Sequence, residues 1–366
     1  MIDFDELRAT LALQCIPGLR KTRARELLQH YNTALNIWEK IPAKEDLPEA
    51  TKPELIKRFQ DSTYLERAEL ALKLAEDSGD KIIHWRDADY PALLSHCPDA
   101  PLVIFTQGKE VLNNGPVIAV VGTREHTAYG EDFLREFVKD LLPYKPLIVS
   151  GFARGIDIQA HLTAIDCGLD TVACLGHGFE KVYPAAHRAY LQRLKQQGCL
   201  LTEYHRGAFV GPMNFVSRNR IIAGMSEVTV VIESADSGGS LITASLANSY
   251  NREVMALPGR YNDPKSKGCN DLIRQNKAAM LNSAHDLVKL MGWDVNEGPV
   301  KSQAKLSMTD PRHQRLATLM QGRSRTHIDE MVVHTSLDVG QIMVILLEME
   351  MQGHIRALPN RYFCLN

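Results

Sequence analysis

The spacing of apolar residues first indicates a helical N-terminal region. From Asp5 to Ser78, apolar side chains recur every three or four positions, which predicts amphipathic helices with no strand between them. Pro17 and Gly18 interrupt this pattern in IPGLRKTRARELL, which resembles a helix-hairpin-helix turn. A DNA-binding hairpin of that kind usually has a second glycine where this chain has Arg20. We therefore favour a structural role for a SAM- or helix-hairpin-helix-like module over residues 1–80.

The middle of the chain changes to short apolar runs separated by amphipathic stretches. A Pro- and Asp-rich segment with a short apolar strand at its end comes first. The runs that follow have the composition and length of buried strands, at 117–122, 146–151, 171–176, 199–204, 227–233 and 253–259. This alternation predicts an α/β fold over residues 81–293, a Rossmann-like, mostly parallel sheet with helices on both faces. Sheets of this kind bind ligands beyond the carboxyl ends of their strands.

The C-terminal part of the chain begins with a polar segment. Residues 294–308 have no periodicity and predict a linker. Three helical patterns from about Arg312 and a final pair of short strands are typical of a winged helix, which we expect over residues 309–366. The third helix carries Glu348 and Glu350 but no Lys or Arg. Because phosphate attraction supplies most DNA affinity, contact with a protein or a structural role is favoured over reading of a duplex.

Charge and cysteine usage indicate where the protein acts. With 42 Lys and Arg against 44 Asp and Glu, the net charge is −2, so contact with a polyanion requires a local cationic cluster. The seven cysteines occur singly, which predicts no zinc site and no disulfide framework and suits the cytoplasm. The first residues are acidic where a signal peptide is basic, and no apolar run has the length of a membrane span. We expect neither secretion nor membrane anchoring.

The turns after the first two predicted strands carry candidate anion-binding groups. Gly122, Thr123 and Arg124 precede a helix, where amides, a hydroxyl and a guanidinium suit a phosphate. This turn matches neither the G-x-G-x-x-G fingerprint nor a Walker-A loop, and an ordinary surface turn explains it equally well. In the second turn glycines flank an arginine, so that amides and a guanidinium can reach one anion. The candidates there are Ser150, Gly151, Arg154 and Gly155. In the following helix, we interpret Asp157 as an N-terminal cap and His161 as a packed histidine.

Later segments, which we expect to form loops at the same edge of the sheet, add basic, aromatic and hydroxyl groups. Cations for phosphates beside rings for exposed bases are what a single strand of nucleic acid requires. The segment SADSGGSLITA offers a further amide-rich turn at the start of a helix. The candidates are Lys181, Phe215, Arg218, Asn219, Arg220, Ser237, Gly238, Ser240 and Lys265. For each of them a solvated surface position is the alternative.

Eight motifs, taken in order, resemble those of the DNA-processing protein A family, also called DprA or Smf. They are YPALL, VVGTR, VSGFARGID, YP, FVSRNRIIAG, SGGSLITA, LPG and KGCNDLIRQ, which lie between Trp85 and Trp293. The resemblance implies a cytoplasmic homodimer, formed through the Rossmann-like domain. Such a protein binds and protects incoming single-stranded DNA during natural transformation, and it loads a RecA-type recombinase onto that DNA.

The resemblance also suggests residue roles. It places Arg124 at the family's phosphate-contacting arginine and Phe215 where an aromatic ring meets the bases. Arg218 to Arg220 fall in the adjoining basic motif. Val216 stands where the family often has proline.

Two other functions remain open. A Rossmann-like enzyme acting on a ribosyl phosphate usually shows PGG-x-GT-x-x-E where this chain has ESADSGGSLITA. The sequence contains no recognisable nucleophile–base–acid arrangement and no metal-ligand cluster, so we expect no enzyme activity, no cofactor and no metal. The second alternative is an adaptor whose arginines only make the surface soluble.

Overall fold

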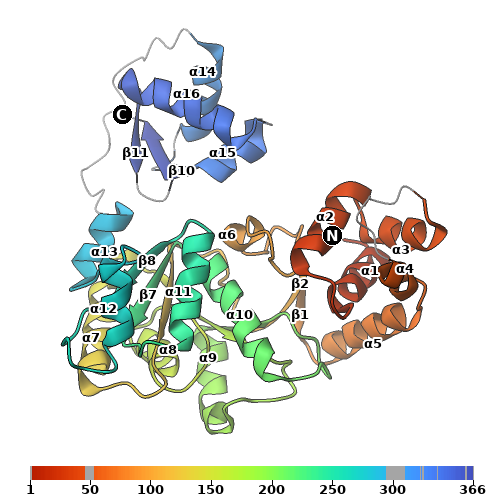
Figure 1. Ribbon diagram of the computed structural model, residues 1–366, viewed down its shortest axis with the longest axis horizontal. Helices are drawn as coiled ribbons and strands as arrows, with labels where there is room; N and C mark the ends of the chain where they lie inside the picture. Colours follow the sequence, from red (N-terminus) through yellow and green to blue (C-terminus); the bar gives the residue numbers. More distant parts are fainter. Residues whose placement is uncertain are drawn as a thin grey trace. The chain divides into compact units, whose positions relative to one another are not determined.

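The computed structural model describes residues 2–45, 53–293, 310–321, 323, 325–335, 337–358 and 361–365 (Figure 1). The chain forms two compact units, Met1–Met280 and Leu281–Asn366. The first unit contains the N-terminal helices and the large sheet, and the second contains the winged helix. The predicted linker, residues 294–308, lies outside the described residues.

The first unit opens with helices, as the apolar spacing predicts. They are α1 (Phe4–Cys15), α2 (Lys21–Tyr31), α3 (Ala34–Ala43), α4 (Pro53–Phe59) and α5 (Thr63–Asp77). Their apolar faces share a core with Leu102, Val103 and Phe105, which lie in and before a strand of the large sheet. The helices therefore pack on the edge of the sheet.

Buried polar contacts attach these helices to the sheet. The side-chain amide of Gln14 donates to the carbonyls of Val103 and Glu203, both at 3.0 Å, and its oxygen accepts from the amides of Leu102 and Val103. Lys21 lies 3.4 Å from the Glu203 carboxylate, and the Arg25 guanidinium donates to two backbone carbonyls. These two cations of the hairpin segment thus hold the helices in place, which agrees with a structural role for this module.

The large sheet has nine strands in the order β1-β2-β6-β5-β4-β3-β7-β8-β9. All six predicted strands are present, and the neighbours from β6 through β9 are parallel. The strands are β1 (Lys81–His84), β2 (Val103–Gly108), β3 (Val117–Gly122), β4 (Leu147–Ser150), β5 (Thr171–Leu175), β6 (Gly198–Thr202), β7 (Val228–Ile232), β8 (Glu253–Ala256) and β9 (Ala279–Met280). The sequence pattern missed β1 and β9, which are four and two residues long.

Helices cover both faces of this sheet (Figure 1). Val172 and Cys174 of β5 pack in one core with residues of α10 and α11, and the alternate residues Ala173 and Leu175 pack in another with residues of α8 and α9. The helices of this region are α6 (Ala92–Ser95), α7 (Ala128–Asp140), η1 (Leu142–Tyr144), α8 (Ile156–Asp166), η2 (Ala185–Tyr190), α9 (Leu191–Gln197), α10 (Pro212–Gly224), α11 (Gly239–Ser249) and α12 (Lys267–Arg274). The predicted Rossmann-like architecture is confirmed.

The strand order reverses at β3. The chain runs outward from β3 through β4, β5 and β6, and then returns to the other side of β3 with β7 and β8. In doubly wound sheets the carboxyl ends of the strands beside such a reversal form the usual binding crevice. The turns after β3, β4, β5 and β7 are therefore the place to examine.

The second unit contains the predicted winged helix. Its elements are α13 (Ala284–Met291), α14 (Pro311–Met320), β10 (Thr326–His327), α15 (Ile328–Thr335), α16 (Val339–Met351), β11 (Ile355–Leu358) and β12 (Tyr362–Leu365). The three strands form one antiparallel sheet, and Leu316, Ile345 and Phe363 belong to the core. The second of the three helical patterns, THIDEMVVH, predicted a helix that begins at Thr326. That detail is wrong, because Thr326 and His327 pair with β12 before α15 begins.

Among the described helices, none by itself has the length and hydropathy of a membrane span. The bent pair α15 and α16 meets that test only when its two helices, which lie at 113°, are taken together.

Candidate nucleic-acid interface

The turn after β3 presents an unpaired guanidinium. A Cβ on Gly122 would lie 2.0 Å from the carbonyl oxygen of Ile232 on the adjacent strand, so only glycine fits there. The amide of Thr123 donates to the carbonyl of Glu233 at 2.8 Å and is not available to a ligand. Arg124 is exposed, and within the described ranges its guanidinium has no hydrogen-bond or ion-pair partner. The turn therefore offers a cation, and its Thr123 and Glu125 amides are already hydrogen-bonded within the protein.

The turn after β4 packs directly against the turn after β3. Gly155 has a φ of +80°, and a Cβ there would lie 2.1 Å from the carbonyl oxygen of Thr123 and 2.6 Å from the Cα of Arg124. The exposed side chain of Arg154 immediately precedes this contact. Like Arg124, it has no ion-pair or hydrogen-bond partner among the residues that the structure describes. Two guanidinium groups without a hydrogen-bond or ion-pair partner in the described residues thus start from turns whose backbones touch.

The predicted Ser150 and Gly151 lie below the surface. Ser150 is fully buried, and its hydroxyl donates to the carbonyl of Val120 at 2.6 Å, which joins β4 to β3. Gly151 is also buried. A Cβ on Gly151 would lie 2.5 Å from both Nη1 of Arg218 and Oδ2 of Asp157. These two residues therefore shape the turn from inside.

The expectation that Arg218 and Arg220 lie in a loop is wrong. Both belong to helix α10, which begins at Pro212 after Gly211. Proline suits the first turn of a helix because its missing N–H would have no intrahelical partner there. The buried face of the helix includes both arginines. The segment looked like a basic loop because cations occupy positions where an amphipathic helix normally has apolar residues.

Arg218 ties helix α10 to the ends of two strands. Its side chain is 5% exposed, and its Nη1 donates to the carbonyls of Gly151 and Cys174. Burial lowers the pKa of the Arg218 guanidinium and raises the pKa of the Asp157 carboxyl, while the attraction between the two charges opposes both shifts. Asn219 is half-buried and its Oδ1 accepts from the Nε of Arg218 at 3.2 Å. The Arg218 guanidinium is thus bound by groups inside the protein.

Arg220 has a similar internal role on the next part of the helix. It is 5% exposed, and its Nη2 lies 2.6 Å from the carboxylate of Glu203. Lys21 of the N-terminal helices approaches the same carboxylate. The nearby positive charges hold the pKa of the Glu203 carboxyl below its usual value, although burial acts in the opposite direction. Arg220 therefore links α10, the end of β6 and helix α2.

An aromatic pair lies at the end of β5. The ring of Phe215 packs on Gly176, where a Cβ would lie 2.9 Å from Cδ1 of the phenylalanine. Its centroid is 5.2 Å from that of Tyr183, which is 57% exposed. The Nε2 of His177 accepts from the amide of Tyr183 at 3.2 Å, which holds the tyrosine in place. Lys181 is exposed in the same loop. Rings and a cation therefore occur together here, as the sequence predicts.

The loop after β8 is brought to the turn after β3. The Nζ of Lys265 donates to the carbonyl of Glu125 at 2.5 Å, next to Arg124. Lys265 thus tethers this loop.

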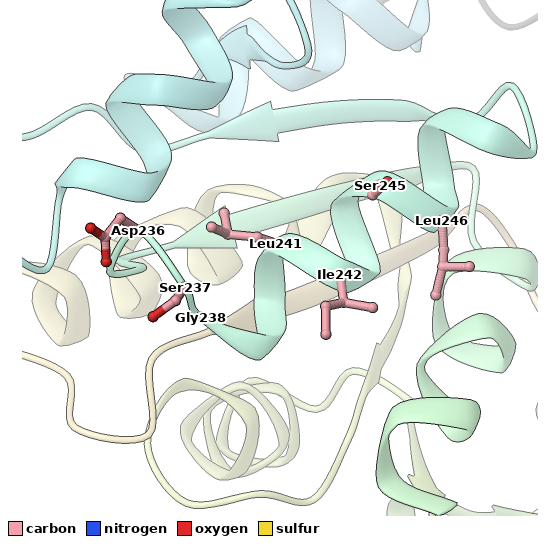
Figure 2. A pocket seen from close by; sticks show the side chains of 7 residues that line it. All are labelled: Asp236, Ser237, Gly238, Leu241, Ile242, Ser245 and Leu246. Carbon is pink, nitrogen blue, oxygen red and sulfur yellow. The ribbon is translucent and has the colours of Figure 1, made fainter. Parts of the chain in front are cut away.

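The later part of the turn after β7, residues 236–240, makes a different set of contacts. Ser240 is buried and its hydroxyl donates to Ser234 at 2.9 Å. Ser237 and Gly238 line an open hollow of about 400 Å³, and Figure 2 shows Asp236 beside them and apolar side chains along α11. Asp236 is exposed and pairs with Lys267 at 2.8 Å. No contact found among the described residues joins this hollow to Arg124 or Phe215, and the acid at its rim disfavours a phosphate.

Two features of this edge were missed by sequence reasoning. Buried Glu233, at the end of β7, accepts from the amide and the hydroxyl of Thr127 and so fixes the start of α7. The acid that ends the apolar strand run was the available signal. Phe209 and Met213 are highly exposed near the start of α10, and the segment GAFVGPMNF shows them as apolar residues beside turn-forming glycines.

The winged helix contains one cluster of potential metal ligands. Side-chain atoms of Asp310, His313 and Glu348 lie within 4.8 Å of one another. Arg312 already pairs with both carboxylates, at 2.7 and 3.3 Å. The cluster is therefore an ion-pair network around a buried histidine, and nothing else in the described residues points to a metal there.

The turns after β3, β4 and β5 thus form one edge. Adjacent strands are about 4.8 Å apart, so these three turns lie within roughly 10 Å. Arg124, Arg154 and the Phe215–Tyr183 pair follow one another along it. Among the predicted residues, Ser150, Arg218, Arg220 and Ser240 are buried behind or beside this edge.

The fold and this edge define a Rossmann-like protein with a C-terminal winged helix, and family comparison identifies its class as a DNA recombination mediator. A family described as DNA recombination-mediator protein A matches residues 81–292, and the DprA winged helix domain matches residues 300–361. The chain belongs to this DprA/Smf family of DNA-processing proteins.

Individual relatives agree with this family assignment. Protein Smf of Synechocystis sp. is 28% identical and the match covers 95% of this chain and 96% of the relative. Protein Smf of Escherichia coli is 34% identical, over 75% of this chain and 74% of its own. The DNA processing protein A structure from Streptococcus pneumoniae has a TM-score of 0.63 at 28% identity and covers 77% of this chain and 96% of that one. The Helicobacter pylori protein, described for its single-stranded DNA binding mode, has a TM-score of 0.53 at 24% identity, over 59% of this chain and 96% of that one, and shows the shared fold.

Proposed function

We propose that this protein binds single-stranded DNA along the edge formed by the turns after β3, β4 and β5. One observation carries the proposal. Among the described residues, Arg124 and Arg154 have no hydrogen-bond or ion-pair partner, and they extend from turns in backbone contact, beside an aromatic pair held at the end of the next strand. Guanidinium groups suit phosphates, and flat rings suit unpaired bases of any sequence.

The proposed interface gives the predicted residues two roles. In the proposed interface, Arg124, Arg154 and Lys181 contact phosphates and the Phe215–Tyr183 pair contacts bases. Gly122 and Gly155 allow the backbones to approach closely. Arg218 and Arg220 support the interface from within, because their charges are already used by Gly151, Cys174 and Glu203.

We further propose that the protein acts by binding, as a cytoplasmic homodimer that shields single strands and loads a RecA-type recombinase during natural transformation. Membership in a recombination-mediator family supports this role. The description of the Helicobacter pylori relative supports single-stranded DNA as the ligand. The seven free thiols suit a reducing compartment.

A ribosyl-phosphate enzyme is less well supported by the site. His161 is fully buried, and its Nδ1 lies 2.7 Å from the hydroxyl of Thr171. Burial lowers its pKa to about 3, so the ring stays neutral and is poorly placed to exchange protons with a substrate. The interpretation of His161 as a packed histidine agrees with this geometry.

A titration tests the proposal. Labelled single-stranded and duplex oligonucleotides are titrated with the full chain at several salt concentrations. Stacking of unpaired bases on the rings predicts preferential single-strand binding. Counterion release predicts that the logarithm of the affinity falls by about 0.7 per logarithm of salt for each phosphate contacted. Salt-independent binding, or no binding at micromolar protein, would instead favour the adaptor.

A further inference from the structure

The edge that carries the proposed interface continues past the turn after β5. Strand β6 runs parallel to β5, and Leu175 pairs with Thr202 at their carboxyl ends. The segment after β6, residues 203–211, therefore begins beside the turn after β5. The two backbones touch, because a Cβ on Gly178 would lie 2.6 Å from the carbonyl oxygen of His205. Residues 203–211 thus extend the edge by one more strand.

This segment carries an exposed aromatic ring, that of Phe209. The Cε1 atom of the ring lies 2.8 Å from the position that a Cβ of Gly211 would occupy, so a glycine there lets the ring lie against the start of α10. The Phe209 carbonyl accepts from the side-chain amide of Asn214 at 2.8 Å. Phe209 is nevertheless 85% exposed. Its backbone is thus held by the helix, while most of the ring surface is open to water.

The ring lies close to the Phe215–Tyr183 pair. The carbonyl of Gly211 accepts from the amide of Asn214 at 3.0 Å, so Gly211 belongs to the first turn of α10. Gly211 and Phe215 are four positions apart, which puts them on the same side of the helix with Cβ positions roughly 6 Å apart. Phe209 packs on Gly211 and therefore lies about one helical turn from Phe215.

We propose that Phe209 is a further base-binding position, which receives the base next to the one on the Phe215–Tyr183 pair. This role depends on the proposed function, since the strand must already lie along the edge. Neighbouring bases of a duplex are stacked about 3.4 Å apart. Rings one helical turn apart therefore suit bases that are splayed out of a single strand.

The surroundings of the ring favour a base over a phosphate as its ligand. Arg206 is the only Lys or Arg in residues 203–211, and it pairs with Asp80 at 2.7 Å. The segment therefore offers a ring and no unpaired Lys or Arg. Exposed Lys181 lies in the neighbouring turn, which the segment contacts at Gly178. This continuity favours the DNA strand over a separate protein partner.

A cycle between protein variants and abasic oligonucleotides tests this role. The full chain is titrated with the shortest labelled oligothymidine that retains full affinity, so that the strand cannot shift, and one base at a time is replaced by an abasic site. Phe209→Ala should raise Kd by about 5- to 150-fold, the range for one lost stacked base, with an unchanged salt slope. Phe209→Trp, which keeps a ring, should bind like the parent protein.

The abasic series identifies the base that contacts the ring. One particular abasic site should have no further effect on Phe209→Ala, because its stacking partner is already absent. That base should be the neighbour of the one that shows the same coupling with Phe215→Ala. A ring that only shaped the loop would show no such coupling with a single base.

Met213→Ala is the matched control. Met213 is 72% exposed in the first turn of α10, but it is two positions from Phe215 and so lies about 200° around the helix axis from it. Its removal should leave the affinity unchanged. Both Phe209→Ala and Met213→Ala should keep the unfolding temperature of the parent protein, because both side chains are exposed.

Four results would overturn this role. If Phe209→Ala binds like the parent protein while Arg124→Ala and Phe215→Ala bind more weakly, the interface exists and Phe209 lies outside it. A loss that is coupled to no single base makes the ring a structural part of the loop. An equal loss in Met213→Ala assigns the effect to apolar surface in general. Absence of single-strand binding by the parent protein removes the proposed function together with this role.

Discussion

Replacing Arg218 or Arg124, one at a time, should separate support of the DNA interface from contact with DNA. Arg218→Met keeps the length of the side chain but removes its charge and its hydrogen bonds to Gly151 and Cys174. It also leaves the buried Asp157 without its nearest cation. Arg124→Ala removes an exposed cation with no partner in the described structure.

The expected stability changes differ for physical reasons. Removing one partner of a buried charge pair costs about 3–5 kcal/mol, and this range already includes the carbonyls left without donors. A domain stability of roughly 5–15 kcal/mol leaves the Arg218→Met protein mostly folded. Arg124→Ala should stay within about 0.5 kcal/mol of the parent protein, as is usual for an exposed position. Urea unfolding measures both values.

The two variants should also change DNA binding in different ways. Arg218 lies one helical turn after Phe215, so loss of its anchor displaces the ring, and affinity should fall by up to the roughly 1–3 kcal/mol that a stacked base contributes. The salt dependence stays the same, because Arg218 contacts no phosphate. Arg124→Ala should lower the slope by about 0.7, the value of one phosphate contact.

Titration of a labelled oligonucleotide at several salt concentrations, restricted to conditions in which both variants are folded, provides the assay. A reduced slope with unchanged stability for Arg218→Met would refute the assignment, because it would make Arg218 a surface contact.

The Arg218→Met stability deficit should also shrink as the pH falls. The raised pKa of Asp157 means that protonation of this carboxyl favours the folded state, and the charged form, which costs stability, returns as the pH rises.

Three further outcomes are expected. Phe215→Ala should weaken single-strand binding by about 1–3 kcal/mol with little change in salt slope, and unchanged affinity would remove the ring from the interface. Glu203→Gln should lower the free energy of unfolding by about 3–5 kcal/mol, because Arg220 loses its buried counter-charge, and a change below 1 kcal/mol would contradict this. Burial lowers the pKa of His161 from its usual value of 6.5 to about 3, so its contribution to stability is present above pH 6.5 and is lost on acidification by about 1.4 kcal/mol per pH unit. His161→Gln should therefore show a shallower loss of stability between pH 6.5 and 4 in urea titrations, and an equal loss would show that another group controls it.

Local patterns were sufficient for most of the fold. The parallel strands and the helices of the winged helix follow from apolar spacing within each segment, since each buries its own apolar side chains. Strand β10 could not be found this way, because Thr326 and His327 are held by pairing with Phe363 and Tyr362, far along the chain. The same limit explains why the short β1 was missed.

The interface was predicted less completely, because the roles of its cations depend on distant partners. The turns of Arg124 and Arg154 could be located at strand ends, and Phe215 and Tyr183 could be recognised as aromatic. Nothing near Arg218 in sequence shows that its acceptor, Gly151, lies 67 residues earlier. A charged residue in a sequence is therefore a candidate DNA contact. Only its neighbours in the folded structure distinguish a surface contact from an internal support.

The way Gln14 bridges to the sheet has a consequence for dissecting this protein. Removing the N-terminal helices would strip the apolar cover from Leu102, Val103 and Phe105, and it would leave the Glu203 carboxylate without Lys21. A shortened chain that starts near Lys81 would thus expose an apolar surface at one edge of the sheet and should aggregate in solution. Loss of DNA binding in such a chain would reflect disruption of the contact between the N-terminal helices and the sheet. It could not be assigned to a DNA contact made by the missing helices.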